Sequence, residues 1–214
     1  MNVQRIFVVV FLLLILGNIV AIIFLPERLI YLITKEWGPV ENAQVILYVT
    51  GALVAWIYAR QKIWDGGYQG SLILLIFAMR ELDFQKKFTG ISITRTKYYF
   101  HSDAALTAKL LSALIVISII VLFILFIKKH SKGIYNNVQA RKSWSLSVMA
   151  GLLFMFFAIL LDSITRVLES LGIESVKHGH LLKNPLEELI ELAIPFFFLN
   201  ALLLYGSQTA AIKK

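Results

Sequence analysis

The chain has 214 residues, of which 58% are hydrophobic and only 16% are charged, a more apolar balance than a soluble domain of this length shows. It contains no cysteine, which excludes disulfide bonds, thiolate metal ligands and cysteine nucleophiles. The formal net charge of +8 does not indicate nucleic-acid binding, because basic residues flank membrane helices and no nucleic-acid-binding motif accompanies them.

Six apolar segments make up most of the chain, and a helix needs about 20 such residues to cross the hydrocarbon core of a membrane. They predict spans at residues 6–25, 41–60, 68–85, 106–127, 144–163 and 185–205. The expected fold is therefore an all-α, polytopic membrane helix bundle that forms a single transmembrane domain. Residues 26–37 mix apolar and charged side chains and predict a short interfacial helix after the first span.

Three of these segments carry further signals. The third is continuously apolar only from Ser71 to Met79, so it is either a spanning helix whose polar end lies among the headgroups or a re-entrant hairpin buried in protein. The fifth is expected to continue as an exposed helix towards Leu171. In the sixth, Pro185 suits a first helical turn, and Pro195 is expected to kink the helix.

The charged residues are divided unequally between the two membrane sides that six spans define. The densest basic group contains no acid and falls in the predicted loop after the fourth span: Lys128, Lys129, Lys132, Arg141 and Lys142. Because cytoplasmic loops are rich in Lys and Arg, we expect this loop and both termini to be cytoplasmic. Of the 13 Asp and Glu residues, only Asp65 falls on that side, so the acids gather at the outer side.

Four carboxylates near the outer ends of the predicted helices are the candidates for catalysis: Asp83, Asp162, Glu187 and Glu191. An ionised side chain at membrane depth is costly, so it usually faces the bundle interior and has a partner. Glu191 lies furthest along an apolar helix, four residues before Pro195, whose ring opens the helix beside it. The alternatives are a structural ion pair and, for Glu187 and Glu188, the preference of acids for a helix N-terminus.

Four other side chains are candidates for substrate binding: Arg80, Arg166, Glu41 and Gln44. A guanidinium group suits a phosphate because it donates two parallel hydrogen bonds. Arg80 is three residues from Asp83 and shares its helical face, while Glu41 and Gln44 line one face of the second span. We expect these helix ends to converge on one polar site.

Histidines and one aspartate near the same side are the candidates for a metal site: His101, Asp103, His178 and His180. Imidazole and carboxylate oxygen are ligands for divalent cations, so a divalent metal is the cofactor to test. The spacing matches no established zinc motif such as H-E-x-x-H. The alternative for Asp103 is a helix cap, and for the histidines an interfacial polar role.

Two stretches resemble a family of uncharacterised bacterial inner-membrane proteins. The sequence EWGPVEN at residues 36–42 resembles the acidic-x-Gly-Pro-x-Glu segment with which a helix begins in that family. The sequence RELDF at residues 80–84 is similar to its Arg-Glu-x-Asp segment. The resemblance covers roughly residues 36 to 110 and implies a bacterial cytoplasmic membrane. It implies no particular activity.

Three functions are compatible with an outer-face polar site of acids, arginines and histidines. The first is a metal-assisted hydrolase or transferase that acts on a lipid or lipid-linked substrate. The second is a non-catalytic membrane subunit that docks a periplasmic or membrane protein partner. The third is a proton- or cation-coupled transporter, although the cytoplasmic halves of the predicted spans lack matching acids. Membrane lipid is the expected partner in the first case.

Overall fold

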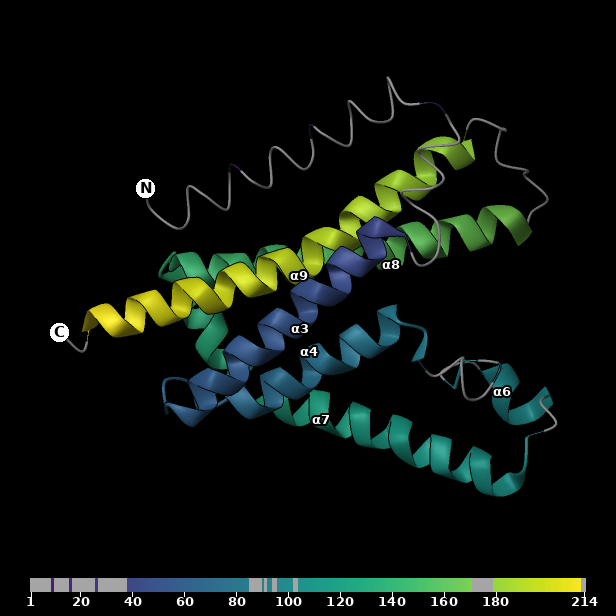
Figure 1. Cartoon of the computed structure of the whole chain (residues 1–214), viewed down its shortest axis with the longest axis horizontal. Helices are drawn as coiled ribbons and strands as arrows, with labels where there is room; N and C mark the ends of the chain where they lie inside the picture. The colour runs from purple at the N-terminus through teal and green to yellow at the C-terminus, as the bar shows by residue number, and fades with distance from the viewer. Residues whose placement is uncertain are drawn as a thin grey trace. The chain divides into compact units, whose positions relative to one another are not determined.

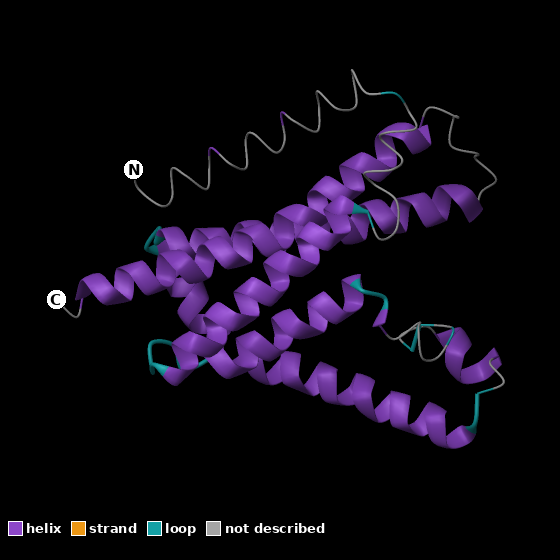
Figure 2. Cartoon of the chain, in the orientation of Figure 1, coloured by secondary structure: helices purple, strands orange, loops and turns teal. Residues whose placement is uncertain are grey.

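A computed structural model describes residues 38–84, 90, 92–93, 96–101, 104–170 and 179–212, together with Val9, Leu16 and Pro26. The described residues form six helices, which are drawn in Figures 1 and 2. These are α3 (Pro39–Arg60), α4 (Gly67–Glu81), α6 (Thr96–His101), α7 (Leu106–Gln139), α8 (Ser143–Ser170) and α9 (Gly179–Ile212). No strand occurs among these residues, so the all-α prediction is confirmed.

Four of the helices are long and apolar enough to cross a membrane. Their candidate spans are Pro39–Arg60, Leu106–Gln139, Ser143–Leu161 and Glu187–Ala210. They overlap the second, fourth, fifth and sixth predicted spans, and α8 continues as a helix to Ser170, beyond its candidate span. Four such helices in one chain indicate a membrane protein. The predicted first span and the predicted interfacial helix fall outside the described residues, apart from Val9, Leu16 and Pro26.

The third predicted span, 68–85, is shorter in the structure. Helix α4 has 15 residues and ends at Glu81, so its length is about 22 Å against a hydrocarbon core of about 30 Å. Beyond it, Asp83 has a left-handed backbone with φ 45°, and its amide donates to the carbonyl of Arg80 at 3.0 Å. Asp83 therefore does not share a helical face with Arg80, because the helix has already ended.

Three of the five basic residues after the fourth span lie on a helix, contrary to the predicted loop. Helix α7 continues through Gln139, so Lys128, Lys129 and Lys132 are helical residues. The helix persists because half-buried positions recur at helical spacing beyond the apolar run, at Phe126, His130 and Ile134. Only residues 140–142 separate α7 from α8.

Helix α9 begins at Gly179, so Pro185 lies inside the helix and not in its first turn. Pro195 also lies inside it. A proline keeps helical φ and removes one backbone hydrogen bond, which a helix anchored on both sides can tolerate. Glu187 and Glu188 consequently lie beyond the first turn of α9. A preference for the positive end of the helix dipole does not explain these two acids, because that effect is confined to the first turn.

The chain divides into two compact units. The first comprises residues 1–47 and 137–214, and in it α8 packs against α9. The rings of Phe154 and Phe197 are stacked with centroids 5.4 Å apart, and those of Trp144 and Tyr205 meet edge to face at 5.3 Å. Aromatic contacts along both helices thus fix this pair. The prediction of a single transmembrane domain stays a prediction.

The second unit comprises residues 48–136 and contains the rest of α3 with α4, α6 and most of α7. Phe77 of α4 joins its neighbours through rings, with centroids 5.6 Å from Tyr48 of α3 and 5.7 Å from Phe123 of α7. Helices α3 and α4 approach closely where α4 begins: a Cβ on Gly67 would lie 2.5 Å from the carbonyl oxygen of Ala55. Only glycine fits there without moving one of the two backbones.

Candidate functional site

The buried side chain of Gln44 of α3 makes a polar contact with the half-buried Glu188 of α9 inside the first unit. Gln44 is only 1% exposed. The Nε2 of Gln44 donates to the carboxylate Oε2 of Glu188 at 3.2 Å and to the carbonyl oxygen of the same residue at 3.4 Å. A hydrogen bond to a carboxylate is stronger than one between neutral groups. Gln44, which the sequence suggested as a substrate-binding residue, is therefore held in place by an acid of another helix.

Glu188 is a site residue that sequence reasoning missed. The sequence explained an acid at this position by a nearby helix N-terminus. In the structure α9 begins nine residues earlier, at Gly179. The signal that could have identified it is spacing, because Glu188, Glu191 and Pro195 lie at positions i, i+3 and i+7 and so share a face of α9. Pro195 on this face is among the largest fully buried side chains.

Three other predicted site residues lie within three positions of Gln44 or Glu188 in the sequence. Glu41 lies in the first turn of α3, three residues before Gln44 and on its face. Glu187 and Glu191 are one turn apart on α9, on either side of Glu188. All three side chains are half-buried. The two helices therefore bring acidic residues to the first unit at the start of two candidate spans.

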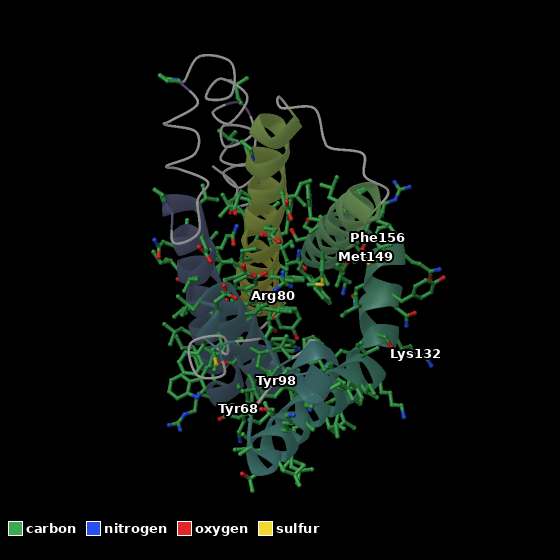
Figure 3. The ribbon with its side chains drawn as sticks, turned by 90° about the vertical axis from the view of Figure 1, so that its right-hand side faces the viewer. Tyr68, Arg80, Tyr98, Lys132, Met149 and Phe156 are labelled. Atoms are coloured by element: carbon green, nitrogen blue, oxygen red, sulfur yellow. The ribbon has the colours of Figure 1, made fainter. Side chains whose placement is uncertain are left out.

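Arg80 and Asp83 belong to the second unit. The Nε of Arg80 lies 3.7 Å from Oε1 of Glu81, the next residue, and the Arg80 side chain is 59% exposed (Figure 3). An exposed contact of this length contributes little to stability. The Glu81 side chain is only 12% exposed, so this acid is more enclosed than its partner.

The other predicted site side chains lie outside the described part of the structure. Asp162 and Arg166 are on α8, His101 ends α6 and His180 is in the first turn of α9, but their side chains are not described. Asp103 and His178 are not described at all. Among the residues that are described, no group of three or more His, Cys, Asp or Glu side chains is arranged to hold a metal. The predicted metal site stays a prediction.

A second polar contact, which is buried, joins α8 and α9 within their candidate spans. The Nδ2 of Asn200, a residue 5% exposed, donates to Oγ of Ser147 at 2.7 Å. The Oδ1 of Asn200 is buried and has no hydrogen-bond partner. A carbonyl oxygen left unpaired in an apolar interior is costly. The sequence held a signal for this residue, since Asn200 interrupts the apolar run of residues 192–205.

The second unit has its own polar cluster where α3, α4 and α7 meet. The Nζ of Lys129 lies 2.7 Å from Oδ2 of Asp65, and the hydrogen bond and charge of Lys129 lower the pKa of the Asp65 carboxyl. Next to this pair, the ring of His130 lies 5.9 Å from that of Trp64 and 4.8 Å from that of Phe126, and its Nε2 is buried without a partner. This cluster fixes the extension of α7 to the turn after α3.

Comparisons with family models, curated proteins and solved structures found no match for this chain. The fold and its contacts define a helical membrane protein with two polar contacts between candidate spans, one part-buried and one buried. The function is therefore proposed from these contacts.

Proposed function

We propose that this chain is a multi-pass protein of the bacterial cytoplasmic membrane that binds a lipid or lipid-linked substrate at the polar contact of α3 and α9. The contact of Gln44 with Glu188 carries the proposal. Desolvating an amide and a carboxylate beside apolar helices costs free energy, and acids retained within membrane spans commonly form ligand or ion sites. Both termini are cytoplasmic in this proposal, and the site faces the outer side.

The residues around the contact favour a ligand with a polar head and an apolar tail. Leu192 and Pro195 are buried on α9 just beyond Glu188, whereas Ile46, two residues from Gln44, is 65% exposed on α3. A headgroup that donates a hydrogen bond or carries a cation can bind the carboxylate, while its acyl chains lie along the exposed apolar side of α3. Lipid is the substrate class that combines these two parts.

Each side chain has a distinct role in this proposal. Glu188 binds the headgroup, and Gln44 orients the Glu188 carboxylate through its hydrogen bond. Glu191 is the carboxylate best placed to act as a general base in a hydrolysis or transfer reaction, because it lies one turn further along the same face of α9. A divalent metal would have to be held by side chains beyond those that the structure describes.

The test separates binding from packing. Wild-type protein, Glu188→Gln and Gln44→Leu are purified in one mild detergent, and the lipids that remain bound are identified by native mass spectrometry. The amide introduced by Glu188→Gln would still accept the hydrogen bond from Gln44 but would carry no charge. We expect Glu188→Gln to keep the wild-type melting temperature and to lose the retained lipid class. Gln69→Leu, which removes a glutamine from α4, is the matched control and should retain the lipid.

Unchanged lipid retention in a folded Glu188→Gln variant would show that the contact serves packing only. A different result would support the non-catalytic subunit that docks a partner. In that case wild type and Gln69→Leu would retain a bound protein and no lipid, and Glu188→Gln would retain neither.

A further inference from the structure

The extension of α7 beyond its apolar run carries exposed basic residues. The apolar run ends at Ile127, and five cations follow within fifteen positions, all of them exposed: Lys128, Lys129, Lys132, Arg141 and Lys142. No Asp or Glu occurs in the sequence between Asp103 and Asp162. Because α7 continues through Gln139, Lys128, Lys129 and Lys132 follow the apolar run on a defined helical surface and not on a free loop.

The packing of the extension fixes which side faces outward. Phe126, His130 and Ile134 form its half-buried side. A Cβ on Gly66 would lie 2.6 Å from the Nε2 of His130, so the imidazole fits closely over the turn between α3 and α4. Rotation of the helix about its axis would break this contact. The orientation of the basic side chains is therefore set by the fold.

The outward side presents Lys128, Lys132 and Tyr135 at positions i, i+4 and i+7. Tyr135 is 62% exposed, and the side chain of Lys132 extends away from the ribbon in Figure 3. Tyrosine next to lysine at the end of an apolar helix is typical of the headgroup region of a membrane. A long lysine side chain can keep its methylene groups on the apolar side and its ammonium among the phosphates.

The five cations differ in their ion pairing within the described part of the chain. Lys129 forms the ion pair with Asp65. Within the described part of the chain, no salt bridge is shown for Lys128, Lys132, Arg141 or Lys142. Arg141 and Lys142 are tied to the last turn of α7, since their amides donate to the carbonyls of Val138 at 2.9 Å and Asn137 at 3.0 Å. On the α7 extension, Lys128 and Lys132 therefore carry positive charges that no salt bridge among the described residues compensates. Arg141 and Lys142 add two more basic residues in the next stretch of sequence.

We propose that this basic extension binds the phosphates of anionic phospholipids in the leaflet where the apolar run of α7 ends. Clusters of four or more basic residues directly next to a membrane span bind anionic lipid surfaces. The site is distinct from the contact of Gln44 with Glu188 and does not depend on the lipid proposed there. Its charge selects an anionic headgroup, whereas an acidic site selects a cationic or hydrogen-bond-donating one.

The experiment uses the full chain in nanodiscs of phosphatidylcholine that contain graded fractions of phosphatidylglycerol. Annular lipid is counted by native mass spectrometry after gentle release. We expect wild type to enrich phosphatidylglycerol over its bulk fraction. Lys128→Gln/Lys132→Gln should weaken that preference by up to roughly 30-fold, because each lysine near an anionic surface contributes about 1 kcal/mol and each 1.4 kcal/mol changes an equilibrium constant about tenfold. Lys62→Gln/Lys109→Gln removes the same charge elsewhere on the chain and should keep the enrichment.

Two further measurements decide the remaining outcomes. Lys128→Arg/Lys132→Arg restores the charges and should enrich phosphatidylglycerol as wild type does; a folded variant of this kind without enrichment would overturn the proposal. Inorganic phosphate added to protein in detergent should not raise the melting temperature as phosphatidylglycerol does. An equal rise with both probes would show a small-anion site in place of a lipid surface. Equal enrichment in wild type and Lys128→Gln/Lys132→Gln would also refute the proposal.

Discussion

The Nε2 of Gln44 lies 3.2 Å from the Oε2 of Glu188, and these two residues are 144 positions apart in the chain. The hydrogen bond between them joins α3 to α9. The same Nε2 reaches the backbone carbonyl of Glu188, so a single side chain of α3 contacts both the backbone and the side chain of α9. The contact fixes the position of α3 along α9 as well as its rotation. Its loss should therefore affect the stability of the first unit.

Gln44→Leu should destabilise the protein by about 1–3 kcal/mol, because it leaves the Glu188 carboxylate without its buried donor. The effect is measured as a lower melting temperature in detergent. Gln69→Leu provides the comparison, since the Oε1 of Gln69 is buried without a partner and its removal leaves no group newly unpaired. Equal changes in the two variants would mean that the Gln44 contact contributes no more than any buried glutamine.

The positions of the long helices could be predicted from the sequence, but several of their ends could not. Apolar runs longer than the membrane is thick define a span without knowledge of its neighbours. The point at which a helix ends outside the apolar run depends on packing. Helix α7 continues past Ile127 because His130 and Ile134 form a half-buried side of the helix there. No local pattern in residues 128–139 shows that packing.

The candidate site was only partly predictable for a related reason. Gln44 was predicted because it lies three residues from Glu41, on the same face of the second predicted span. Its partner Glu188 was assigned to a helix start, and the true start at Gly179 depends on residues that form no apolar run. Asn200 was not predicted, although it interrupts the apolar run of residues 192–205.

The orientation of the chain can be tested at the two ends of α7. We expect Ala105→Cys to react with a membrane-impermeant thiol reagent in intact cells and Asn136→Cys to react only after the membrane is opened. Both positions are exposed and the chain contains no other cysteine, so each label reports one site. Labelling of Asn136→Cys but not Ala105→Cys in intact cells would invert the topology.

Gly67→Ala should destabilise the second unit by about 1–3 kcal/mol, because overpacking forces the helices apart. The added Cβ would lie 2.5 Å from the backbone oxygen of Ala55 and 2.8 Å from the Cβ of Ala59, and neither atom belongs to a flexible side chain. Gly133→Ala is the control within α7, where nothing lies within 4 Å of the added atom. That change should stabilise by about 0.5–1 kcal/mol. Melting temperatures in one detergent measure both, and a neutral Gly67→Ala would contradict the close contact.

The ion pair of Asp65 with Lys129 predicts a pH dependence. The hydrogen bond and charge of Lys129 lower the pKa of the Asp65 carboxyl below 3.8, so its contribution to stability is present above pH 3.8 and disappears as the pH falls through the lowered pKa. Asp65→Asn should therefore melt below wild type at neutral pH, and the gap should close on acidification. The gap should be small and shrink with salt, since the Asp65 side chain is 82% exposed. A gap that is the same at neutral and acidic pH would exclude the ion pair as its cause.

The buried contact of Asn200 with Ser147 predicts that two substitutions together cost less than one of them. Ser147→Ala removes the acceptor at 2.7 Å and leaves the Asn200 amide with both its oxygen and its nitrogen unpaired inside α8 and α9, at a cost of about 1–3 kcal/mol. Adding Asn200→Leu removes both unpaired groups and replaces them with an apolar side chain that, like asparagine, branches at Cγ. The double variant should therefore recover stability relative to Ser147→Ala.

Ser118→Ala is the control for this cycle, because the exposed hydroxyl of Ser118 donates only to the carbonyl of Leu114 in its own helix, at 2.8 Å. Its removal should change the free energy of unfolding by no more than about 0.5 kcal/mol, which is the usual range for exposed substitutions. The four proteins of the cycle and this control are melted in the same detergent. A double variant less stable than Ser147→Ala would mean that Asn200 makes a further contribution, such as a hydrogen bond from its Oδ1 to bound water, that leucine cannot replace.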